Sequence, residues 1–221
     1  NDSLTDNCYK TLTSIFFNIT INDDEVAGYT VSGVQGSLLE ASSKSASFTV
    51  VLDVKPISDV YVNIDVQDST EVIANTDELI FTPDDWNIPQ IVFLSDADEF
   101  IIDGDKNSQI ITSIKPTSSD GFPGLPNQTV SVLTQDNDVS GIILSTIDNL
   151  TDENGDTGSF GIKLATQPSS SVTIFISSSN TGEGTVQGTV VFNSTNWDTI
   201  QVITVTGMDD DPPVSDGAID Y

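Results

Sequence analysis

Acidic side chains recur at matching places along this chain, where they could hold a cation. The segment QDNDVSG at residues 135–141 repeats NDDEVAG at residues 22–28: each begins with a polar residue, continues through three acids or amides, and ends in Val, a small residue and Gly. Denser acidic groups stand between apolar runs, in SDADEFIIDGDK at residues 95–106 and in GMDDDPPVSDG at residues 207–217. Carboxylate oxygens are the ligands that hard cations such as Ca²⁺ prefer.

The composition narrows the choice of ligand. The net charge of −28 argues against binding to nucleic acid or to anionic membranes, because both need Lys and Arg. Histidine is absent and Cys8 is the only cysteine, so the chain lacks the usual nitrogen and sulfur ligands of transition metals. No apolar run is long enough to insert into a membrane. A scattered acidic surface that only keeps the protein soluble is the simpler alternative.

The elements that position these acids belong to an internal repeat of about 112 residues. SASFTVVLDVKPISDVYVNI at residues 45–64 aligns with TGSFGIKLATQPSSSVTIFI at residues 157–176, and Trp86 aligns with Trp197. Alternating apolar residues and frequent turn signals predict antiparallel immunoglobulin-like β-sandwiches with about seven strands per repeat. The expected strands of the complete repeat are residues 28–34, 45–53, 59–67, 78–82, 89–96, 107–115 and 127–135. The two Trp residues are expected to pack against the cores.

The repeat predicts three segments. Residues 1–25 are the C-terminal strands of a preceding repeat, with Phe17, Ile19 and Ile21 facing its interior. Residues 26–138 form the complete repeat, and residues 139–221 form a truncated second one. Strand parity places the acidic loop after the fifth strand, the Glu before the second strand and the exit of the last strand at one end of the sandwich. We therefore expect the carboxylates to meet at the junction between neighbouring repeats, where either protonation or a cation could relieve their repulsion. The abundance of oxygen ligands and the lack of nitrogen and sulfur ligands favour a hard cation.

The order L-x-E, S-F-x-V-x-L, F-x-P-x-x-W-x-x-P-Q-x-V, D-x-D, D-G-D and D-N-D resembles tandem Calx-β-type and related cadherin-like repeats of large extracellular proteins. That resemblance implies Ca²⁺ at one end of each sandwich. It implies these ligands in the complete repeat: Glu40, Asp98, Glu99, Asp103, Asp105, Asp136 and Asp138. The truncated repeat offers an incomplete set: Glu153, Asp209, Asp210, Asp211 and Asp216. The acids of the first junction are Asp23 and Glu25.

Three functions are compatible with these observations. The leading prediction is a structural segment of an extracellular or cell-surface protein, in which Ca²⁺ at the junctions stiffens a stalk or filament such as a flagellar or ciliary hair. Its partners would be neighbouring repeats and, on self-assembly, other chains. The alternative is an adhesion module that binds a glycan or a protein through its end loops. An enzyme is not expected, since the same acids recur in each repeat without a nucleophile motif. Glycosylation sequons stand at Asn18, Asn127, Asn149 and Asn193.

Overall fold

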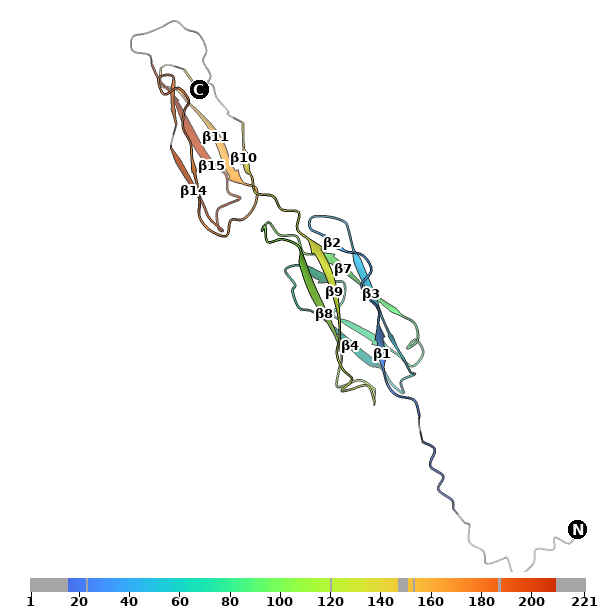
Figure 1. The fold of residues 1–221 in the computed structure, drawn as a ribbon. Coiled ribbons are helices and arrows are strands. Elements are labelled where there is room, and N and C mark those ends of the chain that lie inside the picture. The colour runs from blue at the N-terminus through green and yellow to red at the C-terminus, as the bar shows by residue number, and fades with distance from the viewer. Residues whose placement is uncertain are drawn as a thin grey trace, which may run out of the picture.

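The chain forms two β-sandwiches that follow one another along an elongated molecule (Figure 1). The structure is a computed structural model and describes residues 16–22, 24–119, 121–146, 151–152, 154–186 and 188–209. Within these ranges the secondary structure is all β, and no helix is long and apolar enough to cross a membrane. The predicted all-β, immunoglobulin-like sandwich architecture is confirmed.

The first sandwich contains two sheets. One sheet has the order β1-β3-β7-β5 and consists of β1 (Tyr29–Val31), β3 (Ala46–Leu52), β7 (Gln90–Asp96) and β5 (Val72–Ala74). The other has the order β2-β9-β8-β4-β6 and consists of β2 (Leu38–Leu39), β9 (Gln128–Gln135), β8 (Lys106–Ile114), β4 (Val60–Val66) and β6 (Glu78–Phe81). Period-2 alternation creates these faces: in β3 every second side chain is buried and the intervening ones are partly exposed.

The second sandwich repeats part of this arrangement. Its first sheet has the order β10-β11-β15-β13 and consists of β10 (Ile142–Leu144), β11 (Thr157–Leu164), β15 (Gln201–Gly207) and β13 (Gly184–Val186). Its second sheet pairs β12 (Val172–Phe175) with β14 (Thr189–Phe192). These strands are the counterparts of β1, β3, β7, β5, β4 and β6. In the part of the chain that the structure describes, β2, β8 and β9 have no counterpart there.

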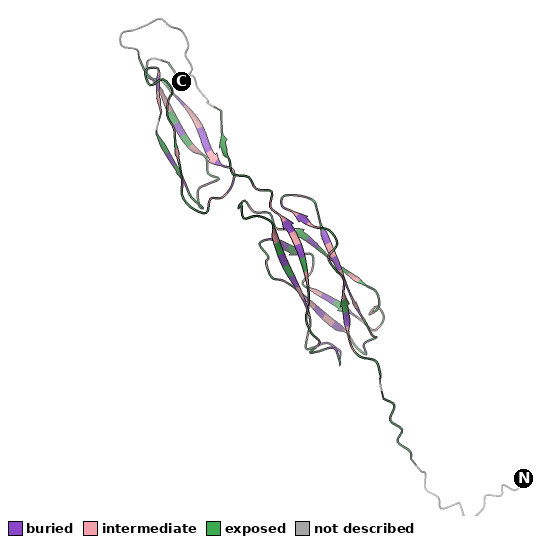
Figure 2. Ribbon diagram, viewed as in Figure 1, coloured by how far each residue is buried: buried purple, intermediate pink, exposed green. Residues whose placement is uncertain are grey.

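Each sandwich has its own core, and Figure 2 shows buried residues alternating with exposed ones along the strands of both. Phe48, Phe81 and Leu94 lie at the centre of the first core, while Phe192 and Ile203 are the most buried residues of the second. Trp86 packs against the first core and Trp197 against the second, in agreement with the expectation that both plug the cores.

The sequence-based description needs three corrections. The first sandwich contains nine strands rather than seven, because β2 and β5 are too short to show a hydrophobic period. The pairing of β2 with β9 is parallel, whereas all pairs were expected to be antiparallel. Residues 16–22 form no strand, and Phe17, Ile19 and Ile21 are exposed, because no partner strand lies beside them in the described part of the chain.

Candidate metal centre

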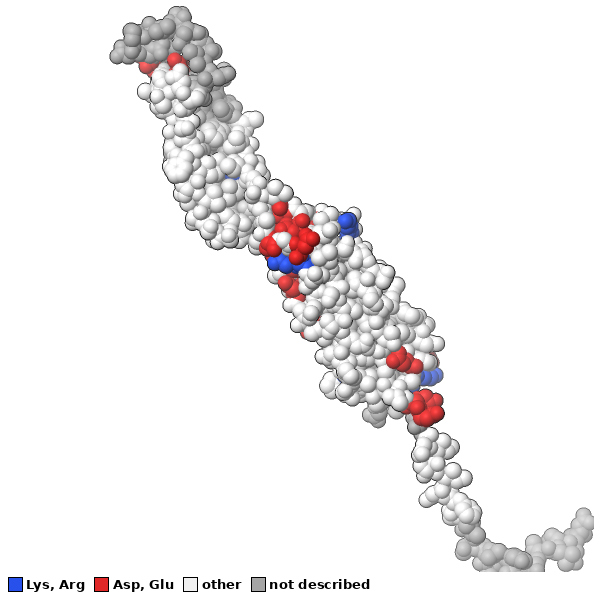
Figure 3. All heavy atoms as spheres, in the orientation of Figure 1, with Lys and Arg blue, Asp and Glu red and all other residues white. Residues whose placement is uncertain are grey.

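Carboxylates from four parts of the first sandwich meet at the end that faces the second sandwich. Glu40 follows β2, Asp136 and Asp138 follow β9, and Glu71 precedes β5. The fourth part is the loop between β7 and β8, residues 97–105, which we call the acid loop. Figure 3 shows these acidic atoms gathered between the two sandwiches, with basic atoms beside them.

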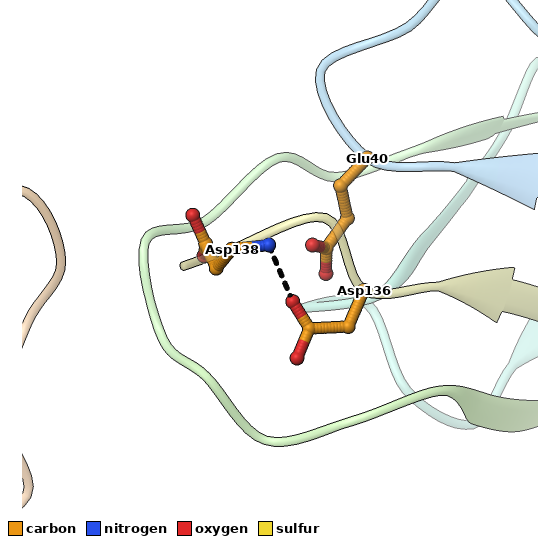
Figure 4. A group of neighbouring side chains, drawn as sticks. All are labelled: Glu40, Asp136 and Asp138. Carbon is orange, nitrogen blue, oxygen red and sulfur yellow. Dashed lines mark hydrogen bonds between the residues drawn. The ribbon is translucent and has the colours of Figure 1, made fainter. Parts of the chain in front are cut away.

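The first group of carboxylates consists of Glu40, Asp136 and Asp138, with one oxygen of each within 4.8 Å of the others. Figure 4 shows the Glu40 side chain pointing from the end of β2 toward the segment that leaves β9. The Asn137 amide donates to Glu40 Oε2 at 3.2 Å, and the Asn137 side chain donates to the Glu40 carbonyl. The parallel pairing of β2 with β9 therefore sets the position of Glu40 relative to the other two acids.

Backbone conformation helps to aim Glu40. The next residue, Ala41, has φ of 52°, in the left-handed region that residues with a Cβ rarely adopt. This conformation turns the chain out of β2 immediately after the carboxylate. Strain of this kind often persists where the surrounding structure fixes a functional geometry.

Asp136 ties the exit of β9 to the acid loop. Its carboxylate accepts hydrogen bonds from the amide of Asp138 at 2.7 Å, from Gly104 at 2.7 Å and from Asp103 at 3.1 Å. The Asp136 amide in turn donates to Asp105 Oδ1 at 3.2 Å. Gly104 has φ of 80°, which only glycine adopts without strain, so its amide can point at the carboxylate. The donors at Asp138 and Gly104 hold the pKa of Asp136 below its ordinary value, so this group is the firmly ionised acid of the site.

The second group consists of Glu71, Glu99 and Asp103, whose oxygens also lie within 4.8 Å of one another. Lys106 reaches Asp103 Oδ2 with its Nζ at 2.8 Å. The two groups are continuous, because the charges of Asp136 and Asp138 act on the pKa of Glu99.

Burial and repulsion raise the pKa values of several acids at this end. Burial is the largest cause for Glu71, whose pKa rises to about 7, and the charges of Glu99 and Asp103 add to it. The pKa values of Glu40, Glu99 and Asp138 are raised for the same two reasons. Glu40 and Glu71 are only 2% and 3% exposed. A cation among these carboxylates would remove both penalties at once.

Two buried oxygens show that the cluster fits a cation. Glu99 Oε1 and Asp138 Oδ2 are both buried, and neither has a hydrogen-bond partner among the described residues. Buried carboxylate oxygens normally have partners, since an unpaired one costs free energy. With Glu40 and Glu71 beside them, these oxygens form an all-oxygen donor set, which suits Ca²⁺. The described residues of the site offer no nitrogen or sulfur ligand.

The structure places the acids predicted from sequence as follows. Glu40, Glu99, Asp103, Asp136 and Asp138 belong to the two groups, Asp105 is hydrogen-bonded to their framework, and Asp98 lies close enough for its charge to raise the pKa of Asp138. Glu25 lies at the opposite end of the first sandwich, and Asp209 is exposed at the end of β15. Five of the predicted acids lie outside the described residues: Asp23, Glu153, Asp210, Asp211 and Asp216.

Glu71 is the acid that the sequence prediction missed. It stands alone in DSTEVIAN, away from the acidic loops, so its sequence neighbourhood gives no sign of a site. The repeat does contain such a sign, because Glu71 aligns with Glu183. The structure repeats the local backbone as well: Ala97 donates to the Glu71 carbonyl at 3.1 Å, and Met208 donates to the Glu183 carbonyl at 2.8 Å.

The acid loop also contacts the second sandwich. The ring of Phe100 lies 5.6 Å from the ring of Trp197, centroid to centroid, with an interplanar angle of 44°. The Gln167 amide donates to the Phe100 carbonyl at 2.6 Å. Phe100 is the direct neighbour of Glu99, so one short loop both supplies carboxylates and touches the next sandwich.

The predicted glycosylation sites remain predictions. Asn18, Asn127 and Asn193 are exposed, as a glycan requires, and Asn149 lies outside the described residues. The hydroxyl and amide of Thr195 both donate to Asn193 Oδ1, so this side chain also shapes the turn after β14.

Comparison with solved structures finds similar folds at low identity. The calcium binding domain CBD12 of CALX1.1 is 16% identical with a TM-score of 0.34, and the match covers 78% of this chain and 72% of that one. The Escherichia coli chaperone DraB is 12% identical with a TM-score of 0.39, covering 87% and 89%. A protein of unknown function from Porphyromonas gingivalis W83 is 14% identical with a TM-score of 0.35, covering 81% and 83%. No family model and no curated protein matches the sequence.

Proposed function

We propose that this chain is a structural segment of an extracellular repeat protein, in which Ca²⁺ binds the carboxylates at the end of the first sandwich and fixes the second sandwich in place. One observation carries the proposal: the acid loop supplies Glu99 and Asp103 to the cluster and also contacts the second sandwich through Phe100. A cation that fixes the loop would thereby fix the junction.

The charge distribution supports a cation at this place. Lys106 is the only basic side chain paired with the cluster among the described residues, and the two groups of the cluster hold six carboxylates. Without a further positive charge, proton uptake by Glu71 would be the main way to relieve repulsion at neutral pH. Binding of Ca²⁺ would replace those protons, and the orphan oxygens of Glu99 and Asp138 would gain a partner.

An extracellular location fits the strength expected of such a site. Extracellular calcium modules bind with Kd values of roughly 10⁻⁴–10⁻³ M, which suits millimolar free Ca²⁺ outside cells. A concentration ten to a hundred times the Kd would add about 1–3 kcal/mol to the free energy of unfolding. The single cysteine allows no internal disulfide, so Ca²⁺ binding would stabilise the sandwich without one. Binding rather than catalysis is proposed, because the sequence has no histidine and no nucleophile motif, and similar acids recur in each repeat.

Small-angle scattering of the chain, titrated from excess chelator to millimolar Ca²⁺, tests the proposal. We expect a longer and less variable particle in Ca²⁺ and a smaller change in Mg²⁺, which demands a stricter octahedron. The matched control is the double variant Glu99→Gln and Asp138→Asn, which keeps the side-chain shapes and removes two charges. It should fold and should not respond to Ca²⁺. An unchanged particle with the native chain would overturn the proposal.

A further inference from the structure

We call the end of the first sandwich opposite the carboxylate cluster its base, and the equivalent end of the second sandwich the second base. The acid loop contacts the second base, and the first base has the same local structure. At the second base, Ala165 donates to the Gly141 carbonyl at 2.9 Å and Leu164 donates to the Trp197 carbonyl at 2.9 Å. At the first base, Asp53 donates to the Gly28 carbonyl at 3.0 Å and Leu52 donates to the Trp86 carbonyl at 3.2 Å. The two bases therefore share their strand ends and the position of the tryptophan.

Among the described residues, only the second base is contacted by an acid loop. There Gln167 donates to Phe100, and Ile101 and Ile102 line a hollow of about 480 Å³ together with Gly141, Thr166 and Pro168. The residue that aligns with Gln167 is Lys55. Its amide has no hydrogen-bond acceptor among the described residues, and a hollow of about 760 Å³ lies beside it. We call this hollow the base socket. Its lining includes Ala27, Val54, Ile57 and Trp86 and the charged residues Glu25, Asp53 and Lys55.

The base socket and the second base differ in their side chains. Val54 and Ile57 stand where the second base has Thr166 and Ser169, and Ile57 is 81% exposed. The base socket also carries three charged side chains, Glu25, Asp53 and Lys55, whereas no charged side chain lines the second base among the described residues. Val54 and Ile57 match an apolar loop tip, and the acid loop has such a tip at Phe100 and Ile101.

The segment before the base socket indicates where such a loop would come from. Phe17, Ile19 and Ile21 align with Val130, Val132 and Thr134 of β9, and Val132 and Thr134 are buried against the first core. The distance along the chain from this pattern to Gly28 equals the distance from β9 to Gly141. A sandwich that used residues 16–22 as its last strand would therefore be joined to the first sandwich by a connector of the same length as the one between the first and second.

We propose that the base socket binds the acid loop of a preceding sandwich of the same kind, with an aromatic or aliphatic tip packed beside Trp86 and its carbonyl accepting from the Lys55 amide. The first sandwich would then be held at both ends in the same way. This contact is made by apolar packing and a backbone hydrogen bond, so it does not rest on metal binding.

Disulfide trapping in a lengthened chain tests the proposal. A second copy of residues 26–138, which contains a complete core and both sheets, replaces residues 1–25 and thereby removes Cys8. The test pair is Phe100→Cys in the added copy with Lys55→Cys in the copy that follows it. Residues joined by a single backbone hydrogen bond have Cα atoms roughly 5 Å apart, which is within disulfide range.

Two control pairs calibrate the result. The positive control is Phe100→Cys with Gln167→Cys in the original chain carrying Cys8→Ser. The negative control pairs Phe100→Cys of the added copy with Lys44→Cys of the following copy, because Lys44 is an exposed lysine at the far end of that sandwich. We expect the Lys55 pair to oxidise to a majority of cross-linked chain, as the Gln167 pair does, in either chelator or Ca²⁺. A Lys55 pair that forms no more cross-link than the Lys44 pair would overturn the proposal. Failure of the Gln167 pair to cross-link would also overturn it, because the proposed contact is inferred from the contact between Phe100 and Gln167.

Discussion

The two sandwiches share six strands but differ in what closes their cores. In the first, β4 lies between β6 and β8, and Val60 and Val62 are fully buried. In the second, the equivalent strand β12 pairs with β14 alone among the described residues, and Val172 and Ile174 are only partly buried. The strands β8 and β9 account for the difference. The same two strands complete the site, because β8 follows the acid loop and the end of β9 delivers Asp136 and Asp138. The core and the site therefore depend on the same two strands.

The largest effect is expected when an equivalent core phenylalanine is removed from each sandwich. Phe48 is 1% exposed in the first core, and its counterpart Phe160 is partly buried beside the second. We expect Phe48→Ala to lower the free energy of unfolding of its sandwich by about 3–5 kcal/mol, because it leaves a cavity in a closed core. Phe160→Ala should cost about half as much or less. Urea unfolding followed by amide hydrogen exchange would report each sandwich separately, and equal losses would contradict the difference in closure.

A second test concerns pH in the absence of metal. The pKa of Glu71 is about 7 in the folded chain and has an ordinary value of 4.5, so between these values the folded chain binds a proton that the unfolded chain does not. Proton uptake by the folded state stabilises it, so the stability of the first sandwich rises as pH falls from about 7 toward 4.5 and is lost again as pH increases. The expected gain is on the order of 1–3 kcal/mol.

Thermal melting in chelator at pH 5.0 and 7.5 measures this effect. The variant Glu71→Gln should show a smaller difference in melting temperature between the two pH values, since it removes the group whose pKa rises most. Glu183→Gln in the second sandwich is the matched control and should leave the pH dependence intact. A first sandwich that is more stable at pH 7.5 than at pH 5.0 without metal would show that the carboxylates do not repel one another as described.

A third, smaller effect concerns the backbone beside Glu40. Ala41 has a positive φ of 52°, and in the second sandwich the nearby positive φ falls on Gly155 instead. We expect Ala41→Gly to raise the stability of the first sandwich by about 0.5–1 kcal/mol, because glycine adopts this conformation without strain. Chemical denaturation measures the change. A loss of stability would mean that the entropy of the unfolded chain outweighs the strain.

The smallest effect is expected at Lys106. Its contact with Asp103 is partly exposed, so Lys106→Gln should change the stability of the metal-free protein little. The same substitution should tighten Ca²⁺ binding, because the lysine charge opposes a cation at the cluster. Equilibrium dialysis with the native chain and this variant would measure the change in Kd. Weaker binding by the variant would place the cation away from Asp103.

Several strands and part of the candidate site could be predicted from the sequence. Alternation around Phe48, Val62 and Val132 predicts β3, β4 and β9 to within about a residue, because each has one face against the core. Strand parity also brings Glu40 toward Asp136 and Asp138, although the strand count on which it rests is too low by two.

Other features depend on tertiary structure. Glu71 is buried by the packing of neighbouring loops, which no local pattern records, although its alignment with Glu183 was available. The two-residue strand β2 exists only through its pairing with β9. The contact of Phe100 with Trp197 joins separate sandwiches, and an exposed aromatic in an acidic loop does not by itself reveal its partner.

Calorimetric titration of the chain with Ca²⁺ tests the central claim most directly. The account predicts saturable binding at pH 7, stronger for Ca²⁺ than for Mg²⁺, with protons released as Glu71 gives up the one it holds. Binding should be lost in the double variant Glu99→Gln and Asp138→Asn and kept in Glu183→Gln. Absence of a saturable Ca²⁺ signal in the native chain, or an undiminished signal in the double variant, would contradict the assignment of these carboxylates as the site.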